Sequence, residues 1–153
     1  NFVKRVKEFI PYLRGVIHEY HDIFTGNIIA QSRMKGVGIL SREDAISFLP
    51  KQDLFILPAL RDASPRVVRE AMACGVPCIV TDIPGARDLI VDNESGILVP
   101  SGSAEKIAEA MRSLMNDRTK LQKLAKASRE RIINEFSVEA YVSYFDKLFA
   151  SLS

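Results

Sequence analysis

The residues best suited to chemistry lie in one stretch of this 153-residue chain, where an apolar run gives way to a polar helix start. Ser64 is a favoured N-cap residue, and Pro65 fits the first helical position, where its missing N–H costs nothing. The amides of Arg66, Val67 and Val68 would then lack partners at the positive end of the helix dipole, where an anion is attracted. The stretch therefore predicts a site for a phosphate or a diphosphate, with the Arg66 side chain adding a cation.

Two carboxylates, Asp62 and Glu70, bracket this helix start. Carboxylates repel phosphates but accept hydrogen bonds from sugar hydroxyls, and an acid near a diphosphate commonly holds a ribose. A second interpretation is structural, with Asp62 solvated in a turn and Glu70 paired with Arg66 or Arg69 on the helix surface. Spacing alone leaves both interpretations open.

The cysteine and histidine residues do not predict a metal site. Cys74 and Cys78 are separated by Gly75-Val76-Pro77, but no further ligands lie near them, and structural zinc usually takes four. His18 and His21, three residues apart, do not by themselves predict a metal site either. We expect buried thiols, ordinary histidines and no bound metal.

Apolar runs alternate with helical patterns through the middle of the chain, which is typical of a parallel sheet with helices on both faces. The runs expected to form strands are residues 37–40, 53–58, 77–81 and 96–99. The helices expected between them are 41–48, capped by Ser41, then 65–74 and 86–90. Ligands of such sheets bind beyond the carboxyl ends of the strands, which is where the segment 58–65 begins.

The final third of the chain reads as three amphipathic helices, each preceded by a small polar residue that can accept from first-turn amides. Those residues are Ser103, Asp117 and Ser137, and the helix after Ser137 has a broad apolar stripe. Residues 2–13 predict one more amphipathic helix, whereas 16–30 have no legible pattern. Together the elements predict one α/β domain, a Rossmann-like parallel sheet with a helical C-terminal third.

Composition excludes some classes of protein. The chain has 21 basic and 19 acidic residues, so its net charge of +2 does not favour a nucleic-acid partner. It contains no apolar run of about 18 residues and no secretory signal pattern, which predicts a cytoplasmic protein. One alternative stays open: the basic helix at 2–13 could dip into the inner face of the cell membrane.

Further motifs accompany Asp62 and Glu70, whose spacing is acid-x7-acid. An apolar run at 53–58 precedes them, and the segment 81–90 contains Gly-x-x-acid followed by Leu-Ile. The segment 93–100 is an Asn-Gly turn before an apolar run, and Phe136-Ser137 opens the closing helix. These motifs, in order over roughly residues 37–150, resemble retaining GT-B glycosyltransferases of the glycosyl transferases group 1 family.

The resemblance implies that Glu70 holds the ribose hydroxyls of a nucleotide sugar and that Asp62 holds the hydroxyls of the donor sugar. These two are the candidate catalytic residues, although Asp62 replaces the usual glutamate and loses one methylene of reach. The other implied donor-binding residues are Ser64, Pro65, Arg66 and Val67, together with Gly38, Ile39 and Leu40 beside the base. The donor would carry UDP or GDP, with no cofactor and no metal. Its sugar would be transferred with retention through an oxocarbenium-like state, while the helix terminus stabilises the departing diphosphate.

By the same resemblance, residues 1–153 would be the single donor-nucleotide-binding domain of a two-domain enzyme. The N-terminal acceptor domain and the first strand, which usually carries an Arg and a Lys that clamp the diphosphate, would be absent. We therefore expect the isolated chain to be inactive, with a nucleotide sugar and the acceptor domain as its partners. Two other functions stay open: a non-catalytic binding or regulatory domain on the same fold, and a sugar-nucleotide epimerase.

Overall fold

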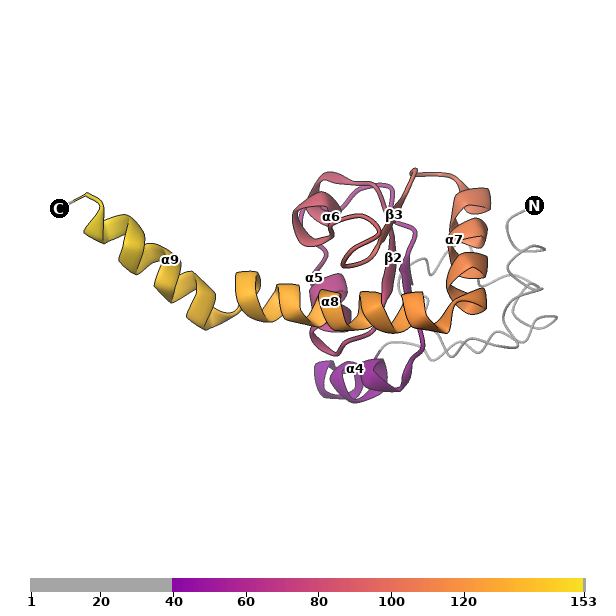
Figure 1. The fold of residues 1–153 in the computed structure, drawn as a ribbon, viewed down its shortest axis with the longest axis horizontal. Helices are drawn as coiled ribbons and strands as arrows, with labels where there is room; N and C mark the ends of the chain where they lie inside the picture. Colours follow the sequence, from indigo (N-terminus) through magenta and orange to yellow (C-terminus); the bar gives the residue numbers. More distant parts are fainter. Residues whose placement is uncertain (1–39, 153) are drawn as a thin grey trace.

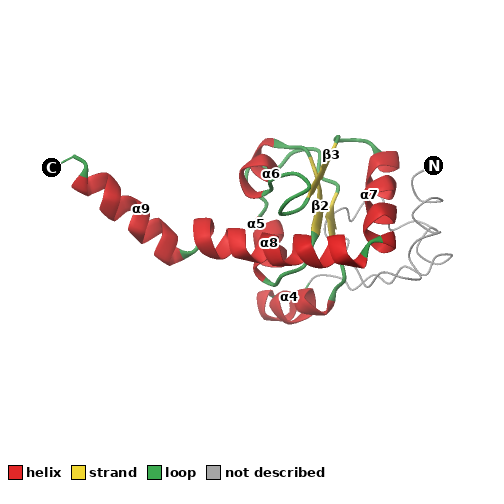
Figure 2. Cartoon of the chain, viewed as in Figure 1, coloured by secondary structure: helices red, strands yellow, loops and turns green. Residues whose placement is uncertain are grey.

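The computed structural model describes residues 40–152, and at the centre of these residues is a three-stranded parallel sheet, two strands of which are labelled in Figures 1 and 2. The strands are β1 (Phe55–Leu57), β2 (Cys78–Thr81) and β3 (Ile97–Val99), in the spatial order β1-β2-β3. The register places Phe55 beside Cys78 and Ile79 beside Ile97. Every residue of β2 is buried, as expected for the middle strand of a sheet that is covered on both faces.

Helices cover both faces of this sheet, as the sequence predicted. Alternate residues of β2 enter two separate cores, with Cys78 and Val80 in one and Ile79 in the other. The first core includes α5 (Arg66–Ala73) and α6 (Pro84–Leu89). The second includes α7 (Ala104–Asn116) and Leu124 of α8 (Arg118–Phe136), and the far end of α8 packs back onto the first core. The Rossmann-like α/β architecture is confirmed.

Small polar residues cap four helices in the way their sequence positions predicted. The Ser41 hydroxyl accepts from the Asp44 amide at the start of α4 (Arg42–Phe48), which leads into a short 3-10 helix, η2 (Leu49–Lys51). The side chains of Ser103, Asp117 and Ser137 accept from first-turn amides of α7, α8 and α9 (Val138–Ala150). Such bonds depend only on neighbours within three residues, so they can be read from the sequence.

The C-terminal end of α5 is also determined by residues that are close in sequence. Gly75 has φ of 71°, the left-handed region in which a side chain is strained. Its amide bonds the Met72 carbonyl, and the Val76 amide bonds the Ala71 carbonyl. These two bonds form a Schellman motif, which turns the chain from the end of α5 toward β2.

Several predicted strands are shorter than expected or lie outside the described residues. The run 53–58 yields a strand only at Phe55–Leu57, and the run 77–81 begins its strand at Cys78. Leu40 is not in a strand but in the irregular chain before α4. The remainder of the run 37–40, the helix expected at 2–13 and the segment 16–30 lie outside the described residues.

The last helix, α9, extends away from the sheet and its covering helices (Figure 1). Its broad apolar stripe is exposed: Tyr141, Phe145 and Phe149 have exposed fractions of 53%, 45% and 64%. The amphipathic pattern correctly predicted the helix, but no part of the described chain buries that stripe. Among residues 40–152, none of the helices combines the length and apolarity needed to span a membrane.

Candidate functional site

The candidate site is the loop between β1 and α5, residues 58–65, at the carboxyl end of β1. Because the sheet is parallel, the chain leaves β2 at the same end, and the connection from β2 into α6 lies against this loop. The Thr81 hydroxyl, at the end of β2, shares its one proton between the carbonyls of Leu57 and Ala59, and the contact with Ala59 is the shorter. The loop therefore occupies the position where ligands of open parallel sheets bind.

The helix start differs by one residue from the sequence prediction. Pro65, not Ser64, occupies the N-cap of α5, with φ of −67° and ψ of 95°, and Arg66 is the first helical residue. The Ser64 amide bonds Oδ1 of Asp62 at 2.9 Å, which holds Ser64 in a turn instead of at the cap. The prediction of Ser64 as the N-cap was wrong because Ser64 takes part in a different local hydrogen bond. Its amide donates to the Asp62 side chain, and its hydroxyl does not cap the helix.

Two of the three amides expected to be free have no hydrogen-bond partner within the part of the chain that the structure describes. The Val68 amide instead bonds the Pro65 carbonyl at 3.1 Å, as tight first turns often do. For the amides of Arg66 and Val67, residues 40–152 provide no hydrogen-bond partner. The Arg66 side chain is exposed and forms no ion pair within the same range. Two amides and one guanidinium therefore remain available to an anion at this helix terminus.

The two carboxylates are in different situations. Asp62 is half-buried, and one of its oxygens already accepts from Ser64, so its other oxygen is the one available to a ligand. Glu70 is also half-buried, and within the described part of the chain no ion pair joins it to Arg66 or Arg69. The purely structural interpretation of Glu70, as a partner of a neighbouring arginine, is not what the structure contains.

The two thiols lie on either side of the turn between α5 and β2, with Cys74 as the C-cap residue of α5 and Cys78 as the first residue of β2. Burial raises the pKa of the Cys78 thiol well above its usual value. Partial burial also raises the pKa of Cys74, with Arg129 acting against this shift and Glu70 adding to it. Both thiols are free, Cys78 is buried and Cys74 is half-buried, so the expectation of buried thiols holds fully only for Cys78.

Three predicted donor-binding residues are not part of the described site. Gly38 and Ile39 lie outside the described residues, and Leu40 is half-buried just before α4. Asp62 and Ser64 therefore lie in the loop before α5, Arg66 and Val67 in its first turn and Glu70 one turn further on, while the roles of these residues and of those expected beside the base stay predictions.

Sequence reasoning missed two residues that contact the loop, Thr81 and Gly85. A Cβ on Gly85 would lie 2.5 Å from the carbonyl carbon and oxygen of Ala63 and 2.8 Å from the Ser64 nitrogen. Thr81 is 1% exposed, and its two carbonyl partners are Leu57, the last residue of β1, and Ala59, in the first half of the loop. The Pro-Gly pair at 84–85 was a visible signal for Gly85, since glycine often marks a close approach of two backbones.

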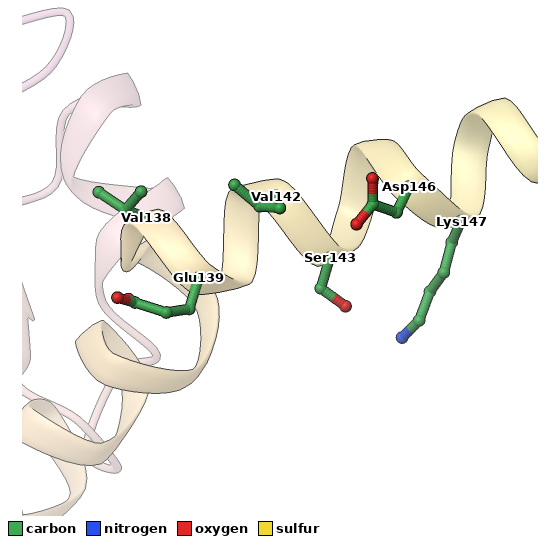
Figure 3. A pocket seen from close by; sticks show the side chains of 6 residues that line it. All are labelled: Val138, Glu139, Val142, Ser143, Asp146 and Lys147. Carbon is green, nitrogen blue, oxygen red and sulfur yellow. The ribbon is translucent and has the colours of Figure 1, made fainter.

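A surface hollow of about 480 Å³ lies along α9 (Figure 3). All its lining residues come from this one helix: Val138, Glu139, Val142, Ser143, Asp146 and Lys147. Because the described chain places no second element opposite them, these side chains alone cannot enclose a small molecule. The hollow is a feature of an uncovered helix and does not compete with the loop at 58–65.

Comparison with known proteins gives a family for the greater part of the chain. The model of the glycosyl transferases group 1 family matches residues 29–131. The capsular polysaccharide biosynthesis glycosyltransferase CapM of Staphylococcus aureus is 36% identical over 94 residues, which are 61% of this chain and 25% of CapM. The solved structure of HepE from Anabaena with UDP-glucose has a TM-score of 0.69 at 22% identity, and the match covers 81% of this chain and 35% of HepE. This chain thus spans a quarter to a third of those proteins.

The beginning of the chain matches a different family. The model of the 49 kDa subunit of respiratory-chain NADH dehydrogenase matches residues 1–49 and overlaps the other match at 29–49. A polypeptide of the NADH-quinone oxidoreductase of Bacteroides thetaiotaomicron is 94% identical over 48 residues, which are 31% of this chain and 9% of that polypeptide. The loop at 58–65 and all of β1, α5 and β2 lie outside this second match.

Proposed function

Because this chain belongs to the glycosyl transferases group 1 family, we propose that it forms the donor-binding part of an enzyme that transfers a sugar from a nucleoside diphosphate sugar. The acceptor that we propose is a growing polysaccharide or a lipid-linked saccharide, and the transfer retains the anomeric configuration. The likeness to CapM supports the acceptor class, and the UDP-glucose bound by HepE supports a nucleotide-sugar donor.

The observation that carries the proposal is the start of α5. The amides of Arg66 and Val67 have no partner among residues 40–152, and they lie between two half-buried carboxylates, Asp62 and Glu70. The amides and the Arg66 guanidinium suit a diphosphate, and the carboxylates suit hydroxyl groups on either side of it. This combination fits a nucleotide sugar better than it fits either a free sugar or a simple anion.

Each residue then has a defined task in the proposed reaction. Glu70 accepts hydrogen bonds from the ribose hydroxyls, and the free oxygen of Asp62 accepts from a hydroxyl of the donor sugar. The amides of Arg66 and Val67 bind the diphosphate more strongly as the glycosidic bond breaks and negative charge builds up on the leaving group. Because these donors are fixed by the helix, little reorganisation is needed when the charge develops.

The proposal is tested by calorimetric titration of the chain with UDP, GDP and their glucose conjugates. We expect one nucleotide to bind and Glu70→Gln to weaken that binding by about tenfold, since a hydrogen bond to a charged group contributes about 1.5 kcal/mol. The matched control is Glu94→Gln, which removes the same charge from an exposed turn. Equal affinities for the Glu70 and Glu94 variants, or a folded wild-type chain that binds no nucleotide, would rule the proposal out.

A non-catalytic nucleotide-binding domain is the second candidate, and the state of Asp62 favours it. The shorter side chain at this position has one oxygen engaged by the Ser64 amide, which leaves a single oxygen for the donor sugar. A domain that only senses nucleotides would bind UDP and UDP-glucose with the same affinity and would be unaffected by Asp62→Asn. A preference for the sugar conjugate that Asp62→Asn abolishes would favour the transferase.

A further inference from the structure

We propose that Thr81 and Gly85, on the connection from β2 to α6, are positioning residues that fix the loop 58–65 in the shape needed to bind the donor. The inference rests on the proposed function, because the loop is assigned there to the nucleotide sugar. Neither residue faces the ligand in this assignment. They act through the backbone of the loop, which they hold at its two ends.

The first contact is at the beginning of the loop. The Thr81 hydroxyl lies 3.3 Å from the Leu57 carbonyl oxygen and also bonds the Ala59 carbonyl oxygen. The Thr81 side chain is fully enclosed, so no water can replace it as a donor to these carbonyls without a rearrangement. A single hydroxyl thereby fixes the direction in which the chain leaves β1.

The second contact is near the end of the loop. Gly85 approaches the peptide between Ala63 and Ser64 so closely that a methyl group there would be 2.5 Å from its carbonyl atoms. Backbone atoms cannot rotate away as a long side chain could, so a Cβ at this position requires one of the two backbones to shift, and the loop is the less restrained of the two. The displaced peptide would include the Ser64 amide, which bonds Asp62, and it directly precedes the amides of Arg66 and Val67.

The connection that makes both contacts is itself firmly held. The Asp82 amide bonds the Val99 carbonyl of β3 at 2.7 Å, and the Ile83 amide bonds the Thr81 carbonyl at 2.9 Å. The Ile83 side chain is buried in the first core, and Arg87 bonds the Asp82 carboxylate at 2.6 Å. In contrast, the loop 58–65 has one hydrogen bond of its own among the described residues, from Ser64 to Asp62. The rigid connection therefore shapes the less restrained loop.

The experiment compares four variants of the chain: Thr81→Val, Thr81→Ser, Gly85→Ala and Gly102→Ala. Valine keeps the shape of threonine without the hydroxyl, and serine restores the hydroxyl. Gly102→Ala is the control for glycine replacement, because a Cβ there would meet nothing within 4 Å. Two quantities are measured: the amide resonances of Ser64, Arg66 and Val67 by nuclear magnetic resonance, and the dissociation constant for UDP.

We expect Thr81→Val and Gly85→Ala to shift those amide resonances and to weaken UDP binding by about tenfold or more, since misplacing a binding group by about 1 Å can cost up to about a hundredfold. Thr81→Ser should restore both quantities, and Gly102→Ala should change neither. If Gly85→Ala does not fold, the comparison of Thr81→Val with Thr81→Ser is sufficient to test the inference.

Two results would overturn the inference: loop resonances unchanged by Thr81→Val, or shifted resonances with unchanged affinity for UDP. A chain that binds only GDP is tested with GDP in place of UDP. A folded wild-type chain that binds neither UDP nor GDP would instead refute the proposed function. In that case the resonances alone would still decide whether Thr81 and Gly85 position the loop.

Discussion

Replacing Arg131 with methionine should destabilise the chain because this side chain joins α8 to the end of α6. Its Nε donates to the Leu89 carbonyl at 2.8 Å, and its Nη2 donates to the Asp88 carbonyl at 3.1 Å. Its Nη1 donates to Glu135 at 2.7 Å, and the guanidinium lies 5.7 Å from the centre of the Phe136 ring. The Arg131 side chain is only 20% exposed, so these contacts are largely shielded from water.

The expected loss in the free energy of unfolding depends on how exposed each partner of Arg131 is. Leu89 is buried, so the bond from a charged donor to its carbonyl contributes about 1.5 kcal/mol. Asp88 and Glu135 are exposed and can be hydrated instead, so their contacts contribute about 0.5 kcal/mol each. The ring contact adds about 0.5 kcal/mol. Methionine retains the apolar stem, so the expected total loss for Arg131→Met is about 3 kcal/mol.

The assay is urea unfolding followed by circular dichroism, with Arg118→Met as the control. Arg118 is 72% exposed, and its guanidinium is 3.7 Å from Asp53, so its loss should cost less than about 0.5 kcal/mol. With a slope of about 2 kcal/mol per molar urea, the midpoint for Arg131→Met should fall by about 1.5 M. Equal midpoints for the two variants would show that the contacts of Arg131 with α6 do not stabilise the fold.

Three further predictions concern the turn after α5, a buried thiol and the exposed helix. Gly75→Ala should lower the free energy of unfolding by about 1 kcal/mol, because alanine is strained at φ of 71°; a urea midpoint equal to that of the wild type would contradict this. Since burial raises the pKa of Cys78 in the folded state, folding stability should be full below the unfolded pKa of about 9 and should fall as the pH rises above it. Between pH 8 and pH 10, the thermal stability of the wild type should therefore fall more steeply than that of Cys78→Ala. An identical pH dependence of the two melting temperatures would refute this prediction. Val142→Ala on α9 should change stability by less than about 0.5 kcal/mol, because Val142 is 55% exposed, and a larger loss in urea unfolding would mean that this face is covered in solution.

The candidate site could be predicted in part because its chemistry lies in a short segment. The acids Asp62 and Glu70 and a helix start within one residue of Pro65 are recognisable from residue types and spacing alone. Which local hydrogen bond forms was harder to predict, since both Ser64 as a cap and Asp62 as an acceptor were plausible. The helix consequently begins at Arg66, and the Val68 amide is already bonded to the Pro65 carbonyl.

The sequence by itself determined the features that depend on close neighbours along the chain. Caps at Ser41, Ser103, Asp117 and Ser137 need only an acceptor within three residues of a free amide, and alternating apolar runs and helical patterns are sufficient to predict a covered parallel sheet.

Only the tertiary structure decided which distant backbones meet. The close approach of Gly85 to Ala63, the bonds from Thr81 to the loop and those from Arg131 to α6 join residues that are about 20 to 40 positions apart. The same holds for α9, whose apolar stripe indicates a helix but not what covers it. Periodicity along one chain records which side of an element is apolar, whereas the partner of that side depends on how all the elements pack together.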